Sequence, residues 1–259
     1  KGFLPVIIPV ILVTILILPA NFSTAAILFT TCLVLMFIGR ISLKYMVSLV
    51  ILGIVGLTLI FTLALAFPNI FPRGGTWIAR LESFFDETKA DSDATYQIDQ
   101  AKIAIVQGGI LGKSPGKSTQ RNFLPHPYSD FIFAIIIEEY GLLGGTFVLM
   151  LYLILFFRVI RIAARSPGNF GTLLSIGIGF SLIFQAMINM AVAVNLFPVT
   201  GQTLPLVSMG GTSIWFTSIA IGIILSVSRM SEIETEDGTE VEVLKEPSLI
   251  PKVATINAS

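Results

Sequence analysis

Long runs of apolar residues, separated by short polar stretches, dominate the sequence. Six runs can be counted, each close to the length of about 20 residues that an α-helix needs to cross a bilayer. They cover residues 3–19, 22–39, 45–67, 131–157, 171–194 and 212–228. This pattern predicts an all-α, polytopic membrane protein with about six transmembrane helices. Because only PANFST (19–24) separates the first two runs, they are expected to form an antiparallel hairpin.

Composition and charge agree with this prediction and add an orientation. Hydrophobic residues make up 54% of the chain and charged residues 12%, whereas about 25% of residues are charged in soluble domains. Outside the long loop and the tail, threading six helices in order places every basic residue on one side: Lys1, Arg40, Lys44, Arg158, Arg161, Arg165 and Arg229. Lys and Arg in short loops stay cytoplasmic. The loops 68–130 and 195–211 are therefore predicted to be extracytoplasmic.

The apolar runs divide the chain into four segments. These are three transmembrane helices in 1–67, a large extracytoplasmic loop in 68–130, three transmembrane helices in 131–230 with the outer loop 195–211, and a cytoplasmic tail in 231–259. In the large loop, apolar spacing in 96–112 predicts an amphipathic helix at the outer membrane interface, ending at Gly108-Gly109. The tail has seven acidic residues, two lysines and no periodicity, so it is expected to be disordered.

Two sets of polar residues lie in the predicted spans or at their edge, where polar groups are costly and often mark a site. The first set is Asp130, Glu138 and Glu139. A continuous helix would place Asp130 at the water edge, about 12 Å above Glu138. The two glutamates equally suit interhelical hydrogen bonds or contacts with basic loop residues. The second set is Gln185 and Asn189, which share a helix face but, as amides, often only tie helices together.

Two loops lead into predicted helices. In FLPHPYSD (123–130), Pro125 and Pro127 bias the residues before them toward extended backbone and so fix the approach to the helix. His126 has no Cys or acidic partners at metal-ligand spacing and is a poor metal ligand.

The second loop is NLFPVTGQTLPLVSMGGTS (195–213). It ends in a glycine pair and hydroxyls at a helix start, a setting that suits phosphate. Glycine-rich turns are common, so this spacing is weak evidence. The sequence has no motif for nucleotide or zinc chemistry, and no nucleic-acid partner is expected.

These two loops also resemble a known family. FLPHPYSDFIFAIIIEEYGLLGG is similar to Leu-Pro-Glu-x-His-Thr-Asp-Phe-Ile-Phe-Ala followed by Glu-Glu-x-Gly, and PVTGQTLPLVSMGGTS is similar to Pro-x-x-Gly-x-x-Leu-Pro-x-x-Ser-x-Gly-Gly-Ser-Ser. Both patterns belong to the SEDS family of shape, elongation, division and sporulation proteins (FtsW, RodA and SpoVE). The similarity runs in order from Lys1 to about Arg229. This chain departs from the first pattern at His126, Tyr128 and Ser129, and it also has Asn195, Gln202 and Met209 where the family usually has Gly or Thr, Leu and Tyr.

The resemblance implies both a topology and an activity. Family members have ten spanning helices, so the six predicted here are expected to be the last six, with four N-terminal helices missing. The implied activity is a peptidoglycan glycosyltransferase that polymerises lipid II, in which Asp130 is the catalytic general base. Its substrate-binding set would be Tyr96, Gln97, Lys113, Lys117, Ser118, Arg121, Gln185, Asn189, Ser208, Gly210, Gly211, Thr212 and Ser213. Structural or tuning roles would fall to Pro125, Glu138, Glu139, Pro198 and Gly201.

Expected partners and location follow from the same resemblance. They are lipid II, a class B penicillin-binding protein with transpeptidase activity, and other divisome proteins, in the bacterial inner membrane. The acidic tail and overall pattern favour the division branch and hence the septum. A divalent cation, Mg²⁺ or Mn²⁺, could help bind pyrophosphate, although the sequence shows no dedicated ligand set. Two other functions stay open: a flippase or transporter for lipid-linked precursors, and a non-catalytic scaffold of the divisome.

Overall fold

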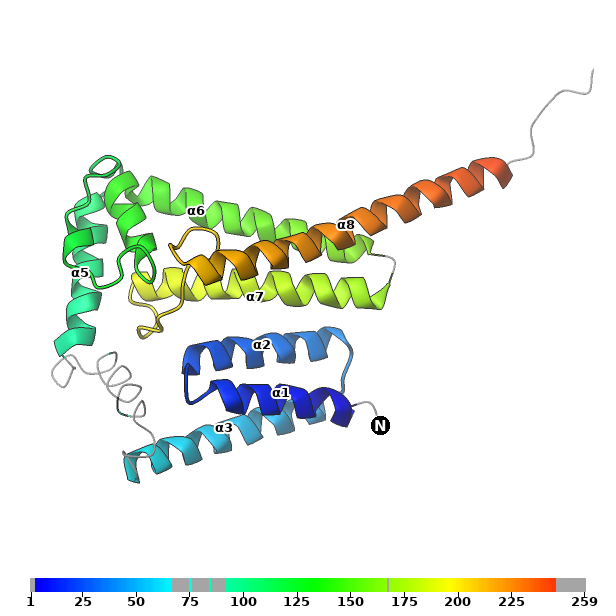
Figure 1. The fold of residues 1–259 in the computed structure, drawn as a ribbon, viewed down its shortest axis with the longest axis horizontal. Helices are drawn as coiled ribbons and strands as arrows, with labels where there is room; N and C mark the ends of the chain where they lie inside the picture. Colours follow the sequence, from blue (N-terminus) through cyan, green and yellow to red (C-terminus); the bar gives the residue numbers. More distant parts are fainter. Residues whose placement is uncertain (1–2, 67–74, 76–83, 85–91, 167, 246–259) are drawn as a thin grey trace, which may run out of the picture.

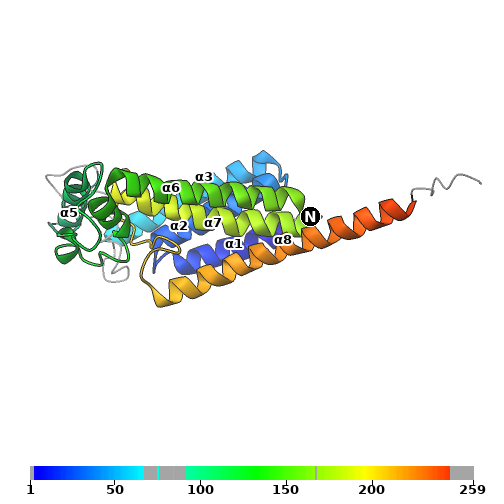
Figure 2. The same cartoon turned by 90° about the horizontal axis from the view of Figure 1, so that it is seen from above.

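The computed structural model describes residues 3–66, 75, 84, 92–166 and 168–245. Across these residues every regular element is helical, and the predicted all-α class is confirmed (Figure 1). The elements are α1 (Phe3–Ile17), α2 (Phe22–Ile38), α3 (Leu43–Ala66), α5 (Ser92–Gly108), η1 (Gln120–Asn122), α6 (Ile132–Arg165), α7 (Asn169–Ala193) and α8 (Gly211–Lys245). Most helices run along a common direction, whereas α5 lies across one end of the bundle (Figures 1 and 2).

Four of the described helices are long and apolar enough to cross a bilayer, by length and composition. These spans are Leu43–Leu63, Ile132–Arg165, Asn169–Ala193 and Gly211–Met230. The helical hairpin α1–α2 is apolar but shorter, with Pro5–Ile17 and Phe22–Ile38. At 1.5 Å per residue, the 17 residues of α2 rise about 26 Å, close to the roughly 30 Å of a hydrocarbon core. The protein is therefore a polytopic membrane bundle, in which four of the six predicted runs reach full spanning length.

The α1–α2 hairpin forms as predicted and contacts the rest of the bundle through α7. Asn21 precedes α2, and its side-chain Oδ1 accepts the Thr24 N–H at 3.1 Å, which caps the helix. At α7, a Cβ added to Gly177 would lie 2.8 Å from Leu35 of α2. Since no larger side chain fits there without a shift of Leu35, α2 and α7 pack at close range.

Different segments of the chain lie at the two ends of the bundle. The α2–α3 and α6–α7 connections, with their Arg40, Lys44 and Arg165, lie at the end near the N-terminus. The helix α5 and the two loops 109–131 and 194–210 lie at the opposite end (Figure 1). The charge pattern thus separates as the sequence predicts, while the side of the membrane that each end faces stays a prediction.

The helix predicted at 96–112 is present as α5, and it packs on the start of α6. Ile98, Ala101 and Ala104 are buried in the same apolar cluster as Phe131. At the end of α5, a Cβ on Gly108 would lie only 2.0 Å from the Ile137 carbonyl oxygen. Backbone therefore meets backbone here, and α5 is fixed directly against the first turns of α6.

Helix α6 is two helices joined by a break at Gly141. This glycine has φ 72° and ψ −175°, far from helical values. The segment 109–114 runs beside the break and supplies four backbone hydrogen bonds: Lys113 N to Glu138 O (2.9 Å), Ser114 N to Glu139 O (3.0 Å), Leu142 N to Gly109 O (2.9 Å) and Leu143 N to Ile110 O (3.3 Å). The expectation of a continuous helix from Asp130 is therefore wrong. A distant segment satisfies the groups that the break exposes, as backbone groups inside a bundle require.

We expect Gly141→Ala to destabilise the fold by about 2 kcal/mol or more. A Cβ at this position would lie 2.1 Å from the Ile110 carbonyl oxygen, and the positive φ is itself unfavourable for alanine. The free energy of unfolding can be measured by titration with a denaturing detergent. Gly222→Ala in α8 is the control, because open space surrounds that glycine, and it should be neutral or stabilising by up to about 1 kcal/mol. Equal stability of the two variants would contradict the role of the break.

The acidic tail is helical where it was expected to be disordered. Helix α8 continues from the membrane span through residues 231–245 to Lys245. Glutamate is a good helix former, and a helix that already exists at Met230 needs no new nucleation step. The expectation of disorder is therefore wrong for 231–245. Residues 246–259, together with most of the loop 67–91, lie outside the described residues.

Candidate active site

Asp130 lies in the loop that immediately precedes α6. The helix starts at Ile132, after Phe131, whose side chain is almost fully buried. The Ser129 hydroxyl donates a hydrogen bond of 2.5 Å to Oδ1 of the Asp130 carboxylate. The other oxygen, Oδ2, faces Gly201, since a Cβ on that glycine would lie 3.7 Å away. One carboxylate oxygen is thus held in place, and the other faces a surface that has no side chain.

The main chain around Asp130 is held by donors from the loop 194–210 and from α7. Three consecutive carbonyl groups accept a hydrogen bond: Tyr128 O from Met209 N (2.8 Å), Ser129 O from Ser208 Oγ (2.6 Å) and Asp130 O from Asn189 Nδ2 (2.9 Å). Ser208 Oγ also accepts the Leu204 N–H at 2.7 Å. The two loops that contain the sequence motifs therefore form one cross-linked unit at this end of the bundle.

The loop 194–210 folds back between the helices instead of remaining outside them. The Tyr152 hydroxyl of α6 donates to the Pro205 carbonyl, and Tyr152 lies eleven residues beyond Gly141, about 16 Å along the helix. Gln185 of α7 donates to the Thr203 carbonyl at 3.0 Å and to its hydroxyl at 3.2 Å. These contacts place polar backbone at the depth of the spans, where it is tolerated only when protein surrounds it.

Four residues predicted to bind substrate have their polar groups engaged within the protein. Ser208 is 3% exposed and Asn189 1% exposed; Ser208 donates to the Ser129 carbonyl and Asn189 to the Asp130 carbonyl. Ser118 is also buried and donates to Glu138, at 2.5 Å. Gln185 is partly buried and donates to Thr203. The geometry therefore favours a positioning role for these residues over direct contact with a ligand.

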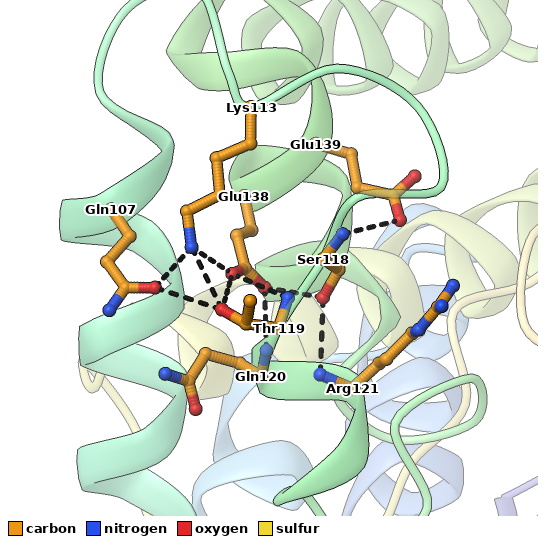
Figure 3. Close-up of polar contacts among 8 residues, drawn as sticks. All are labelled: Gln107, Lys113, Ser118, Thr119, Gln120, Arg121, Glu138 and Glu139. Carbon is orange, nitrogen blue, oxygen red and sulfur yellow. Dashed lines mark hydrogen bonds and ion pairs between the residues drawn. The ribbon is translucent and has the colours of Figure 1, made fainter.

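A second polar cluster surrounds the fully buried carboxylate of Glu138 (Figure 3). Its Oε1 accepts from Lys113 Nζ (2.7 Å), Thr119 N (3.0 Å) and Thr119 Oγ1 (2.8 Å), and its Oε2 accepts from Ser118 Oγ (2.5 Å) and Gln120 N (3.2 Å). Five donors satisfy both oxygens, as a buried carboxylate requires. The carboxylate thereby holds the loop 113–120 against the broken helix. We call these residues the Glu138 cluster.

The Glu138 cluster changes the roles expected for the basic residues of the loop. Lys113 is one of the residues expected to bind substrate, but its ammonium is paired with Glu138 and also contacts Gln107 and Thr119. Lys117 is exposed, and the Arg121 side chain points away from the cluster in Figure 3. Neither forms an ion pair with a carboxylate of the described residues. Lys117 and Arg121 are therefore the cations of the loop 109–131 whose charge is not paired with a carboxylate of the described residues.

Other predicted site residues lie around the same end of the bundle without a common contact. Tyr96 is exposed and Gln97 half-buried on α5. Helix α8 starts at Gly211, as the glycine pair indicated, with Gly211 and Thr212 exposed. The Ser213 hydroxyl is 3.3 Å from that of Thr203. Binding by these residues and by Gly210, and the tuning roles of Pro125 and Pro198, stay predictions.

His126 differs from its expected backbone conformation. Proline at 127 was expected to keep it extended, but its φ is 53°, in the left-handed region. The His126 carbonyl accepts both the Ser129 and Asp130 N–H groups at 3.1 Å. The hydrogen bonds of this tight turn outweigh the preference for extended backbone before proline.

Among the described residues, no three His, Cys, Asp or Glu side chains lie close enough together to hold a metal, so no dedicated ligand set for a divalent cation is found there.

The sequence matches the family described as "Cell cycle protein" (FTSW_RODA_SPOVE) over residues 1–233. The chain belongs to the FtsW/RodA/SpoVE family. The SEDS resemblance of the two motifs is thereby confirmed. The motifs that define the resemblance are the same two loops that the structure cross-links around Asp130.

Individual relatives and one solved structure resemble the chain over most of its length. It is 36% identical over 233 residues to "Stage V sporulation protein E" of Bacillus subtilis (strain 168), covering 89% of this chain and 61% of the relative. It is 34% identical over 237 residues to "Probable peptidoglycan glycosyltransferase FtsW" of Coxiella burnetii, covering 90% and 61%. The chain thus spans about three fifths of the length of these relatives.

The solved structure supports the fold. It is described as "Structural coordination of polymerization and crosslinking by a peptidoglycan synthase complex", and it matches with a TM-score of 0.62 at 24% identity. The match covers 87% of this chain and 61% of that chain. The helical arrangement described above is therefore shared with a structure of known fold.

Two departures from the SEDS motifs can be read in the structure. Ser129 stands where the family pattern has Thr, and its hydroxyl donates to Asp130, so the hydroxyl function is kept. Gln202 stands at a position where the SEDS resemblance leads one to expect Leu, and its side-chain amide donates to Thr24 Oγ1 at 3.0 Å and to Asn21 Oδ1 at 3.4 Å. This chain therefore adds a polar link between its second motif and the α1–α2 hairpin.

Gly201→Val should lower the rate of any reaction in which Asp130 Oδ2 takes part by about tenfold or more. Gly201 has φ 66°, and its missing side chain leaves Asp130 Oδ2 accessible. A branched side chain would crowd the space beside that oxygen, and the left-handed backbone would add strain of about 1–2 kcal/mol. The rate of that reaction, measured with the purified full-length variant, gives the size of the effect. Gly116→Val is the control, since that glycine also has a positive φ but nothing lies within 4 Å of its Cβ position. Equal rates for both variants would count against a reactive group beside Gly201.

Proposed function

We propose that the intact protein is a peptidoglycan glycosyltransferase that polymerises lipid II. The observation that supports this most directly is the Asp130 carboxylate, with Oδ1 held by Ser129 and Oδ2 facing Gly201. It lies at an end of a membrane bundle, where a lipid anchor would present a sugar. Relatives named "Probable peptidoglycan glycosyltransferase FtsW" cover this region of the chain. Asp130 is the general base.

The chemistry follows from the two carboxylate oxygens. Asp130 Oδ2 takes the proton from the 4-hydroxyl of the acceptor sugar as that oxygen attacks the anomeric carbon of the donor. A glycosidic C–O bond forms, the bond from the anomeric carbon to phosphate breaks, and undecaprenyl pyrophosphate leaves with the electron pair. The Ser129 hydrogen bond keeps the carboxylate in one orientation during the transfer. Preorganised groups of this kind are more effective than mobile ones.

The leaving pyrophosphate needs positive charge nearby. Lys117 and Arg121 are cations of the loop 109–131 that are not paired with the Glu138 carboxylate; Lys117 lies within the segment 113–120 that the Glu138 cluster holds in place, and Arg121 directly follows it. The exposed backbone at Gly211 and Thr212 starts α8 and offers N–H groups at the positive end of a helix dipole. We assign pyrophosphate binding to Lys117 and Arg121 of the loop 109–131 and to the N-terminus of α8.

The cellular setting is proposed on the same basis. The protein would act in the bacterial inner membrane at the division septum, with its site on the extracytoplasmic side. Its partner would be a class B penicillin-binding protein among other divisome proteins. Support comes from relatives named FtsW and from the similar fold in a peptidoglycan synthase complex whose description joins polymerisation with crosslinking.

The proposal is tested with the full-length protein in proteoliposomes that contain fluorescent lipid II. A ladder of glycan chains on a gel is the expected product. Transfer of lipid II between leaflets without a ladder would indicate a flippase instead. Absence of both, with retained binding of a transpeptidase domain, would indicate a scaffold. Either of the last two outcomes overturns the glycosyltransferase proposal.

A further inference from the structure

We propose that Asn189 is a positioning residue for Asp130: its side-chain amide fixes the distance between the catalytic carboxylate and the loop opposite it. This inference rests on the proposed function of Asp130. Asn189 lies near the C-terminal end of α7 (Asn169–Ala193), and it is 1% exposed to solvent. It is therefore shielded from solvent, and its amide acts on the groups that it contacts.

The amide joins two backbone segments that come from distant parts of the chain. Its Nδ2 group donates to the Asp130 carbonyl at 2.9 Å and to the Gln202 carbonyl at 2.6 Å. Both N–H bonds are therefore used, one for each loop. Gln202 directly follows Gly201, the residue that faces Asp130 Oδ2. A single side chain thus holds the carboxylate and the surface in front of it.

The orientation of the amide is dictated by these two carbonyl groups. Turning it over would bring its oxygen against two other oxygens, which repel. In the observed orientation Asn189 Oδ1 is buried and has no hydrogen-bond partner among the described residues, a cost of about 1–3 kcal/mol for a polar atom. An amide that served only to tie α7 to a neighbouring helix would have no reason to accept this cost. The two N–H bonds to the site are the contacts that offset it.

The link extends beyond the site to the α1–α2 hairpin. The Gln202 side chain donates to Thr24 Oγ1 and Asn21 Oδ1, while its carbonyl is held by Asn189. The loop position at 202 is therefore fixed from both sides. Removal of the Asn189 amide frees the inner side only, so the loop should stay attached to the hairpin while its spacing from Asp130 changes.

A change of this spacing affects the rate more than substrate binding. A misplacement of about 1 Å can lower a rate about 100-fold when the reacting atoms lose alignment. The groups assigned to pyrophosphate lie on other elements and keep their places. The expected signature is therefore a lower kcat with a nearly unchanged KM, which a general loss of folding would not produce.

The test uses Asn189→Leu, which keeps the approximate size of the side chain but removes both donors. In full-length protein reconstituted with lipid II, kcat should fall about 10- to 100-fold and KM should change by less than about threefold. Ser175→Ala is the control, because Ser175 is a fully buried polar residue of the same helix whose hydroxyl has no partner, and it should retain the parent kcat. If Asn189→Leu does not fold, Asn189→Ser decides by the same comparison, since its shorter side chain fits the site but cannot reach both carbonyls.

The same assay distinguishes failure of this inference from failure of the proposed function. If Asp130→Asn is inactive in the same assay while a folded Asn189 variant retains the parent kcat, Asn189 does not position the base. If Asp130→Asn itself polymerises lipid II normally, the assignment of the general base is wrong and the inference falls with it. A rise in KM with unchanged kcat would also overturn it, because it would place Asn189 in substrate binding.

Discussion

Asp130→Asn should stop glycan-chain formation while leaving the protein folded. The amide keeps the shape of the carboxylate and can still accept a hydrogen bond from the Ser129 hydroxyl, but it cannot take a proton from the acceptor sugar. General bases contribute factors of about 10² to 10⁴ to a rate, so the initial rate of lipid II polymerisation should fall by at least about 100-fold. Gel analysis of the glycan ladder, with lipid II binding measured separately, gives both quantities.

Glu139→Gln is the matched control for that experiment. It also converts a carboxylate to an amide in the same part of the chain. Among the described residues the Glu139 side chain accepts one long hydrogen bond, from Ser118 N at 3.4 Å, so Glu139→Gln should keep the parent rate. Polymerisation by Asp130→Asn at the parent rate would remove Asp130 from the mechanism. Loss of lipid II binding together with activity would instead assign Asp130 to substrate recognition.

The spans could be predicted, and Asp130 could be singled out as a candidate, because each has a local signature in the sequence. Long apolar runs specify transmembrane helices without knowledge of their neighbours. The motif around Asp130 is contiguous in sequence. The break at Gly141 has no such signature, since the bonds that stabilise it come from residues 109–114. A glycine within a helical run does not reveal whether a distant loop pairs with it.

The sequence singled out several polar residues as candidates, but it did not show which groups their side chains bind. Asn189 and Ser208 stood out because of their polarity and their place in a motif, and both lie beside Asp130. Sequence could not show that their partners are backbone carbonyls, because such partners leave no pattern of residue types. Lys113 illustrates the same limit, since only the fold shows that its charge is paired with Glu138.

Glu138→Gln should be the most destabilising single change in the loop region. It removes the charge opposite Lys113 and replaces one accepting oxygen with an N–H₂ group, although five donors converge on the carboxylate. Removing one partner of a buried ion pair costs about 3–5 kcal/mol, and Lys113 is 28% exposed, so we expect about 2–4 kcal/mol. Detergent titration of the purified protein measures the free energy of unfolding.

Comparison with Glu139→Gln separates the Glu138 cluster from a general effect of charge. The two glutamates are adjacent, yet Glu138 is fully buried whereas Glu139 is only partly so. Glu139→Gln should therefore change the free energy of unfolding by no more than about 0.5 kcal/mol. Lys113→Met combined with Glu138→Gln should cost less than the sum of the two single changes, because each removes the same ion pair. Additive costs would show that the Glu138 carboxylate and the Lys113 ammonium stabilise the fold independently. In that case the neutral donors of the Glu138 cluster alone would hold the loop that carries Lys117 and Arg121.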